Sequence, residues 1–215
     1  MNPIDLNIEI KEINYGSKKV VLENISININ QFGIYGVFGK NGQGKSTFLK
    51  SLAGIKSFIG EINLNNSKLT SDLVAYIDTE PIVYEYLTAK EFYKFYQKVS
   101  GKKTNINPDN LFDIDDNIIL KSMSTGTLKK AYINTILQFD DYNIYIFDEP
   151  FNGLDIESNY ILIEKLKQLA KCNIVFVSSH ILEVIQPFLD NIFFVNDKKI
   201  IEIDSSQLYY NLQKK

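Results

Sequence analysis

A glycine-rich loop constrains the fold of this chain more than any other feature. Residues 39–47 read Gly-Lys-Asn-Gly-Gln-Gly-Lys-Ser-Thr. The fixed positions of the phosphate-loop pattern G-x-x-x-x-G-K-S/T are filled by Gly39, Gly44, Lys45 and Ser46. Glycines let the backbone curl tightly and aim successive N–H groups at phosphate oxygens. Lys45 can place its charge against the β- and γ-phosphates, and the Ser46 hydroxyl can ligate Mg²⁺.

The sequence on either side of the loop favours the same interpretation. Gly33–Phe38 is an apolar run that predicts a buried strand, and Thr47–Ala53 predicts a helix whose positive N-terminal end faces the anion. The alternative is a chance glycine-rich turn, which requires neither flanking element. We therefore expect a bound nucleoside triphosphate, ATP, with Mg²⁺. The residues expected at its phosphates are Gly39, Lys40, Asn41, Gly42, Gln43, Gly44, Lys45, Ser46 and Thr47.

Length and charge indicate a single domain over residues 1–215 that has no broad nucleic-acid surface. The 215 residues carry a net charge of -3, and no nucleic-acid partner is expected. All the positive charge is lysine, so an arginine finger would have to come from another chain. The sequence holds no run approaching the roughly 20 apolar residues that span a bilayer.

Hydrophobic periodicity predicts an α/β chain. Alternating residues predict half-buried antiparallel strands, and two apolar runs predict parallel strands buried on both faces. The alternating or shorter strand-like runs are 8–10, 20–29, 60–64 and 73–77, and the apolar runs are 143–147 and 173–177. Helices are predicted at 87–96, 129–139 and 158–171, with Thr88 as the N-cap of the first. Short helices and loops are expected between the end of the 87–96 helix and about residue 120.

Two acids at the end of the first apolar run form the second half of the expected site. Asp148 and Glu149 follow Ile144–Phe147, and Pro150 comes next. A carboxylate at the end of a buried strand suits Mg²⁺, here Asp148 through a coordinated water. Glu149 is then placed to polarise an attacking water as a general base. An ordinary polar turn after a strand is the alternative, and the phosphate loop favours catalysis.

Further motifs make the chain resemble the ATP-binding-cassette (ABC) ATPases over essentially its full length. Tyr15 stands where that family places an aromatic ring on adenine, and Asn152–Asp155 resembles its D-loop. His180 ends a strand where the family has a switch histidine that contacts the γ-phosphate. The resemblance implies a P-loop NTPase fold with a mixed central sheet and an antiparallel β subdomain. A small helical subdomain is implied at approximately residues 80–135.

Two motifs depart from the commonest family pattern. The signature sequence, usually Leu-Ser-Gly-Gly-Gln, is Met123–Thr127 here; it keeps Ser124 and Gly126, which the resemblance implies contact the partner's γ-phosphate. At the Q-loop, Thr79 stands where a glutamine would touch Mg²⁺ and the attacking water. Threonine is too short to reach as glutamine does, so Asp78 or Glu80 replaces it, or coupling to a membrane partner is altered.

The resemblance also implies a mechanism and partners. Two ATPase subunits, identical or different, would close head to tail around two ATP molecules, and hydrolysis would use Glu149 and His180. The leading interpretation is the ATPase subunit of an exporter of drugs, antimicrobial peptides or similar cargo. It would sit on the cytoplasmic face of the membrane, bound to a separate integral membrane permease. The alternatives are a soluble, non-transport ABC switch acting on a protein assembly, and an unrelated P-loop kinase or GTPase.

Overall fold

The computed structural model describes residues 4–16, 19–102, 110–139 and 141–213. Its strands are β1 Leu6–Tyr15, β2 Lys19–Ile29, β3 Gly33–Phe38, β4 Ile59–Leu64, β5 Ser67–Lys68, β6 Val74–Ile77, β7 Ile144–Asp148, β8 Ile174–Ser178, β9 Asn191–Asn196 and β10 Lys199–Ile203. Its helices are α1 Lys45–Leu52, α2 Ala89–Ser100, α3 Thr125–Leu137, α4 Ile156–Leu169, α5 Leu182–Ile185 and α6 Leu208–Gln213. Part of the polar stretch expected to form loops, 103–109, lies outside the described residues.

The strands form two sheets. The first is antiparallel with the order β2-β1-β4-β5, as the alternating residues predicted, and its burial alternates along the strands. The second has the order β10-β9-β3-β8-β7-β6, in which all neighbours are parallel except β10 and β9. Strands β3, β7 and β8 are buried along their whole length, as continuous apolar runs require. The predicted α/β fold with a mixed central sheet is confirmed.

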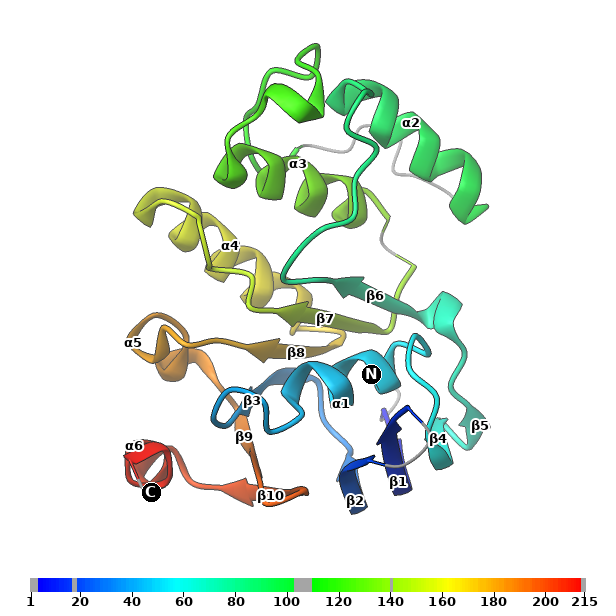
Figure 1. The fold of residues 1–215 in the computed structure, drawn as a ribbon, viewed down its shortest axis with the longest axis vertical. Coiled ribbons are helices and arrows are strands. Elements are labelled where there is room, and N and C mark those ends of the chain that lie inside the picture. Colours follow the sequence, from blue (N-terminus) through cyan, green and yellow to red (C-terminus); the bar gives the residue numbers. More distant parts are fainter. Residues whose placement is uncertain (1–3, 17–18, 103–109, 140, 214–215) are drawn as a thin grey trace.

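The mixed sheet separates two hydrophobic cores. One face packs against the antiparallel sheet and α1, through residues such as Val37, Ile146 and Phe48. The other face packs against α3 and α4, through the alternate residues of the same strands, such as Tyr145 and Phe147. Figure 1 shows α1 in front of the mixed sheet, with β1, β2 and β4 at the lower right. The parallel strands carry their C-terminal residues to one edge, which brings the loop after β3 toward Asp148 and Ser178.

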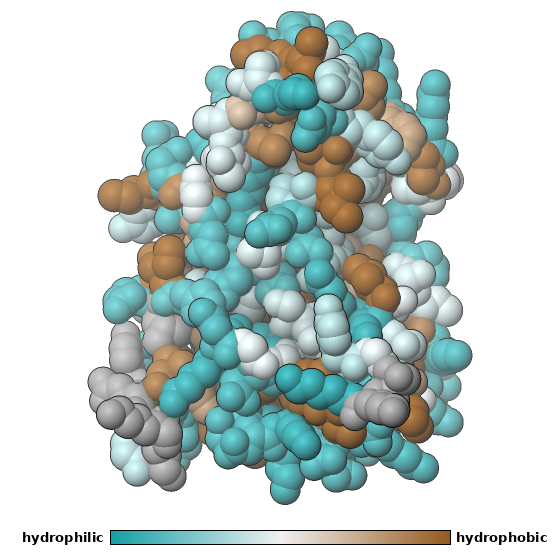
Figure 2. All heavy atoms as spheres, viewed as in Figure 1, coloured by the Kyte–Doolittle hydropathy of each residue, from teal (hydrophilic) through white to brown (hydrophobic). Residues whose placement is uncertain are grey.

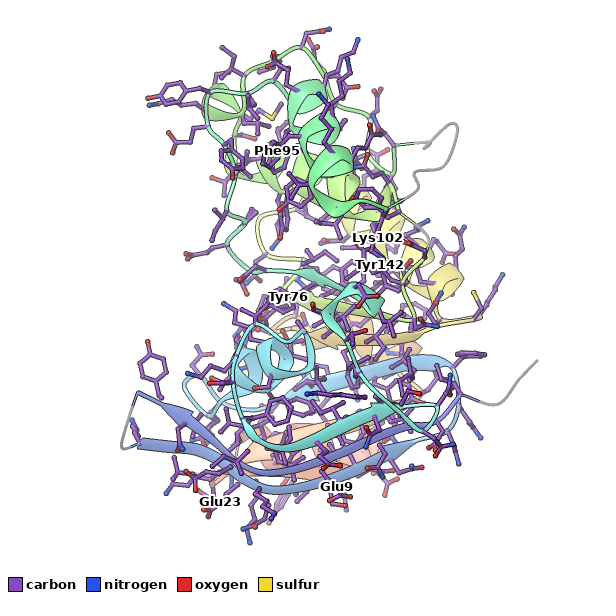
Figure 3. All side chains as sticks on the ribbon, turned by 90° about the vertical axis from the view of Figure 1, so that its right-hand side faces the viewer. Glu9, Glu23, Tyr76, Phe95, Lys102 and Tyr142 are labelled. Carbon is purple, nitrogen blue, oxygen red and sulfur yellow. The ribbon has the colours of Figure 1, made fainter. Side chains whose placement is uncertain are left out.

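Helices α2 and α3 form the end of the molecule opposite the antiparallel sheet (Figure 1). The predicted N-cap Thr88 makes a capping box with Glu91 at the start of α2. Figure 3 shows Phe95 among these helices and Glu9 and Glu23 at the far end of the molecule, with Tyr76 between them. Both helices lie at the approximate position of the predicted helical subdomain. None of the helices in the described ranges is long and apolar enough to cross a membrane.

Three helices begin earlier than predicted, and the first of them, α1, starts at Lys45 and not at Thr47. Helix α3 starts at Thr125, not Lys129, because the Ser124 side chain accepts the N–H of Thr127. Helix α4 starts at Ile156, not Ser158, because the Asp155 side chain accepts the N–H of Ser158. An N-cap fixes the start of a helix before its apolar stripe begins. The predicted starts of α3 and α4 were therefore wrong by about one helical turn and about half a turn.

Candidate functional site

The phosphate loop joins β3 to α1 in a conformation that glycine makes possible. Gly39 has a φ of 149°, and a Cβ built there would stand 2.3 Å from the Val195 carbonyl oxygen. Gly44 has a φ of 110° and caps α1, leaving the first N–H groups of the helix directed into the loop. The buried Lys45 ammonium donates to the Gly39 carbonyl at 2.9 Å and to the Lys40 carbonyl at 3.4 Å. The loop is therefore already curled around its lysine.

A hollow of about 640 Å³ lies over this loop, within the size range of small-molecule sites. It brings together most of the residues predicted from sequence: Tyr15, Asn41, Gly42, Gln43, Gly44, Lys45, Ser46, Thr47, Thr79, Glu149 and His180. Lys19, Lys198 and Asn152 add to its wall. Among the described residues, neither Ser124 nor Gly126 lines it. One chain thus supplies a cation-lined hollow that lacks the signature residues.

Tyr15 forms the outer part of this hollow. Its ring is 72 % exposed, and the ammonium of Lys56 lies 5.3 Å from the ring centroid. An exposed ring next to a phosphate-binding loop offers a flat surface on which a base can stack. The stacking role that the resemblance implies for Tyr15 stays a prediction.

Asp148 ends β7 with its carboxylate held by two hydroxyl groups. Ser178 Oγ donates to Asp148 Oδ1 at 2.6 Å, and the Tyr76 hydroxyl donates to Oδ2 at 3.0 Å. Asp148 is 1 % exposed. Burial, followed by the nearby charge of Asp148, raises the pKa of Tyr76, so its hydroxyl stays protonated and remains a donor. These bonds orient the carboxylate toward the strand edge that carries the loop.

Glu149 is held at its backbone N–H and at its carboxylate. Its backbone has a φ of 51°, in the left-handed region that non-glycine residues rarely adopt. Its N–H donates to Ser178 Oγ at 2.9 Å, and its carboxylate accepts the His180 N–H at 3.0 Å. The other carboxylate oxygen lies 2.9 Å from His180 Nε2, which donates to it when protonated. Burial raises the pKa of Glu149, and His180 and Lys45 offset part of that shift.

The raised pKa of Glu149 has a chemical consequence. A stronger base accepts a proton from water more readily, provided that it is ionised at the working pH. Glu149 lines the same hollow as Lys45 and His180, so a water molecule between it and a terminal phosphate would meet a base, an ammonium group and an imidazole. This arrangement suits hydrolysis of a phosphoanhydride bond.

Thr79 lies in the hollow but does not point a free hydroxyl proton into it. Its Oγ1 donates to the Asp148 carbonyl oxygen at 3.1 Å, which leaves only oxygen lone pairs for another contact. Asp78, one alternative for the missing glutamine, pairs with the Lys50 ammonium at 2.9 Å. Glu80, the other, is exposed. The ion pair commits Asp78 to α1, so the loop at Thr79 is linked to the phosphate-loop helix.

The signature residues lie at the start of α3, against the segment that follows Glu149. Ser124 is exposed and caps the helix, and a Cβ at Gly126 would stand 2.6 Å from the Gly153 carbonyl oxygen. Lys130 pairs with Asp155 at 2.7 Å, and this contact lowers the pKa of Asp155. The signature turn is therefore packed on the D-loop of its own chain and presents Ser124 outward.

Sequence reasoning missed three residues that shape this site. Ser178, Tyr76 and Lys129 hold Asp148 and Glu149, although none was assigned a role. Ser178 has a sequence signal, because it ends a buried strand parallel to the one that delivers the acids. The other two have none, since their roles depend on reaching across the fold to positions 72 and 20 residues away.

Comparisons with known proteins agree with this fold and hollow. The family model described as ABC transporter matches residues 22–152. The lantibiotic transport ATP-binding protein SrtF of Streptococcus pyogenes is 31 % identical, with 94 % of this chain and 93 % of SrtF covered. The bacitracin transport ATP-binding protein BcrA of Bacillus licheniformis is 31 % identical over 87 % of this chain and 65 % of its own length.

Solved structures share the fold. An ATP-binding subunit of an ABC transporter superposes with a TM-score of 0.79 at 23 % identity, covering 98 % of this chain and 95 % of that one. A bacterial Atm1-family ABC exporter with ATP bound gives a TM-score of 0.80 at 14 % identity, covering 97 % and 40 %. The phosphate loop, the acid-ended strand and the family match lead to one assignment. The chain belongs to the ABC transporter family, as an ATP-binding and ATP-hydrolysing subunit.

Proposed function

We propose that this subunit hydrolyses ATP in a head-to-tail dimer and drives an exporter of antimicrobial peptides or similar cargo. The observation that carries the dimer is the division of the site within one chain. Glu149, His180 and the phosphate loop line one hollow, whereas Ser124 and Gly126 stand outside it. A second subunit in the opposite orientation would bring its Ser124 and Gly126 against the ATP held here.

Mg²⁺ fits the donors that are present. The described residues contain no cluster of three His, Cys, Asp or Glu side chains that could cage a metal ion. Mg²⁺ needs no such cage, because it keeps several waters and is bound through one or two protein oxygens and the substrate phosphates. Ser46 and Asp148 would hold the ion, with the Thr79 oxygen beside them. Its charge would neutralise the negative charge that develops on the phosphates.

The remaining steps belong to the chain's own residues. Lys45 would leave the Gly39 and Lys40 carbonyls to contact the β- and γ-phosphates. Glu149 would orient the attacking water and accept its proton, and His180 would contact the γ-phosphate while keeping the Glu149 carboxylate in place. Tyr15 would stack on the adenine. Loss of the γ-phosphate would remove the charge that Ser124 of the second subunit binds, and the dimer would open.

The dimer can be tested with the isolated subunit. Specific ATPase activity should rise with protein concentration, since each complete site needs two chains. Glu149→Gln should bind ATP without hydrolysing it and elute as a dimer on size exclusion, whereas wild type without nucleotide elutes as a monomer. Full activity in a dilute sample shown to be monomeric would rule out the composite site.

The transport role is supported by relatives and by one surface. SrtF and BcrA are named for the transport of a lantibiotic and of bacitracin. The segment between β6 and α2 exposes three large side chains, Ile82 at 85 %, Tyr84 at 56 % and Tyr86 at 77 %. Figure 2 shows apolar side chains on that end of the molecule. We assign this surface to a membrane permease, which would place the subunit at the cytoplasmic face of the membrane.

Co-purification tests the partner. A tagged subunit extracted from its native membranes in mild detergent should retain an integral membrane protein at stoichiometric level. Ile82→Asp should lose it, whereas Tyr210→Asp on α6, 67 % exposed at the other end of the molecule, should keep it. Recovery of wild type only from the soluble fraction, with a soluble protein assembly attached, would favour the non-transport switch instead.

A further inference from the structure

Lys129 is a buried lysine that the proposed mechanism does not use. It lies in the first turn and a half of α3 and is 4 % exposed. Its ammonium donates to the Glu149 carbonyl oxygen at 2.6 Å and to the Asn152 carbonyl oxygen at 3.2 Å. Within the described part of the chain, no carboxylate lies within ion-pair distance of it. The ammonium is therefore held by backbone carbonyls alone.

Burying this charge carries a cost. Burial lowers the pKa of Lys129 to about 8, against the opposing attraction of Glu149 and Asp148. A methionine would fill similar space without desolvating a charge, but it would leave the two carbonyls without this donor. The ammonium is therefore retained at a cost, and its contacts indicate its role.

The contacts of Lys129 fall on the turn that presents the general base. The N–H of Glu149 is held by Ser178 and its carboxylate by His180, so the Glu149 carbonyl is the remaining polar group of that residue. The left-handed backbone of Glu149 is costly and persists only when its surroundings fix it. Lys129 supplies that fixation, because one ammonium bridges the two carbonyls at the ends of the turn from 149 to 152.

We propose that Lys129 is a positioning residue for the hydrolytic step: it fixes the turn that aims the Glu149 carboxylate by clamping the carbonyls of Glu149 and Asn152 to α3. Without the clamp, the Glu149 carbonyl keeps only the long 3.4 Å bond from the Asn152 N–H, and the carboxylate loses its alignment with the attacking water. A misplacement of about 1 Å can lower a rate by 10²-fold. This inference rests on the proposed role of Glu149.

The test is a kinetic comparison of Lys129→Met with wild type. We expect kcat to fall at least about 10-fold at saturating ATP, within the range that loss of alignment produces. The KM and the affinity for a non-hydrolysable ATP analogue should stay within about twofold, so that the loss is confined to kcat. Lys129→Gln, which keeps a donor on a shorter side chain, should retain more activity than Lys129→Met. Lys167→Met, which removes an exposed lysine paired with Glu164 on α4, is the matched control.

Two other results overturn the proposal, and each is recognisable. A kcat for Lys129→Met within twofold of wild type removes the positioning role. Joint loss of analogue binding, melting temperature and kcat in both variants, or failure of both to fold, would mean that Lys129 only supports the fold. Absence of turnover in wild type would count against the hydrolytic function itself and not against Lys129.

Discussion

Removing the Ser178 hydroxyl should destabilise the protein more than any other single-oxygen deletion near Asp148. Ser178 is fully buried, and its Oγ donates to Asp148 Oδ1 while accepting the Glu149 N–H. Ser178→Ala thus removes a hydrogen bond to a charged group and leaves a buried N–H without an acceptor. The space left by one oxygen is too small to admit a water molecule in its place.

The magnitude follows from those two losses. A hydrogen bond to a charged group contributes about 1.5–3 kcal/mol, and a buried donor left unsatisfied costs about 1–3 kcal/mol. We therefore expect the free energy of unfolding to fall by about 3–5 kcal/mol in Ser178→Ala. Tyr76→Phe removes one bond to Asp148 and strands no donor, so its loss should be about 1.5–3 kcal/mol.

Urea unfolding without nucleotide, followed by circular dichroism, measures both losses. The midpoint should fall in both variants at an unchanged m-value, and further in Ser178→Ala. A loss below about 1 kcal/mol in Ser178→Ala, or a larger loss in Tyr76→Phe, would refute the reasoning, because each bond would then be replaceable.

Substitutions at three further residues test the hollow. Glu149→Gln should lower phosphate release by at least about 100-fold while ATP binding persists, and unchanged turnover would remove Glu149 from the role of base. Tyr15→Ala should weaken ATP binding by roughly 5- to 150-fold in a fluorescence titration, because stacking of a base on a ring contributes about 1–3 kcal/mol. Tyr15→Phe should bind as wild type does, and equal affinity in all three proteins would exclude stacking. His180→Ala should move the acid limb of the pH–rate profile to higher pH: His180 lowers the raised pKa of Glu149, and only the ionised carboxylate acts as a base. An acid limb that stays in place would show that the two groups do not interact.

The sequence predicted what depends on local pattern. The glycine spacing identifies the phosphate loop, and the apolar runs ending in Asp148 and in Ser178 place those residues at one sheet edge. The starts of α3 and α4 were misplaced, because caps act outside the apolar periodicity. The hairpin of β9 and β10 was not predicted at all, although its Val195 carbonyl is what restricts residue 39 to glycine.

The side-chain partners of Asp148 and Glu149 could not be predicted, for a different reason. Whether Tyr76 or Lys129 reaches Asp148 or Glu149 depends on how far each side chain extends across packed elements. Spacing along the chain carries no such information, because the contacts join positions that only the tertiary fold brings together. For the same reason the sequence does not reveal that Asp78, one alternative for the missing Q-loop glutamine, forms an ion pair with Lys50.

The attachment of α3 to residues 149–155 has a mechanical consequence for the proposed dimer with two ATP sites. Gly126 packs against Gly153, Lys130 pairs with Asp155, and Lys129 bridges the turn from 149 to 152. The start of α3 and residues 149–155 should therefore move as one rigid unit. One end of this unit would hold Ser124 over the ATP of the neighbouring subunit, and the other end would carry Glu149 of its own site. Hydrolysis at one site would then displace the signature residue at the other, so the two sites would be mechanically coupled.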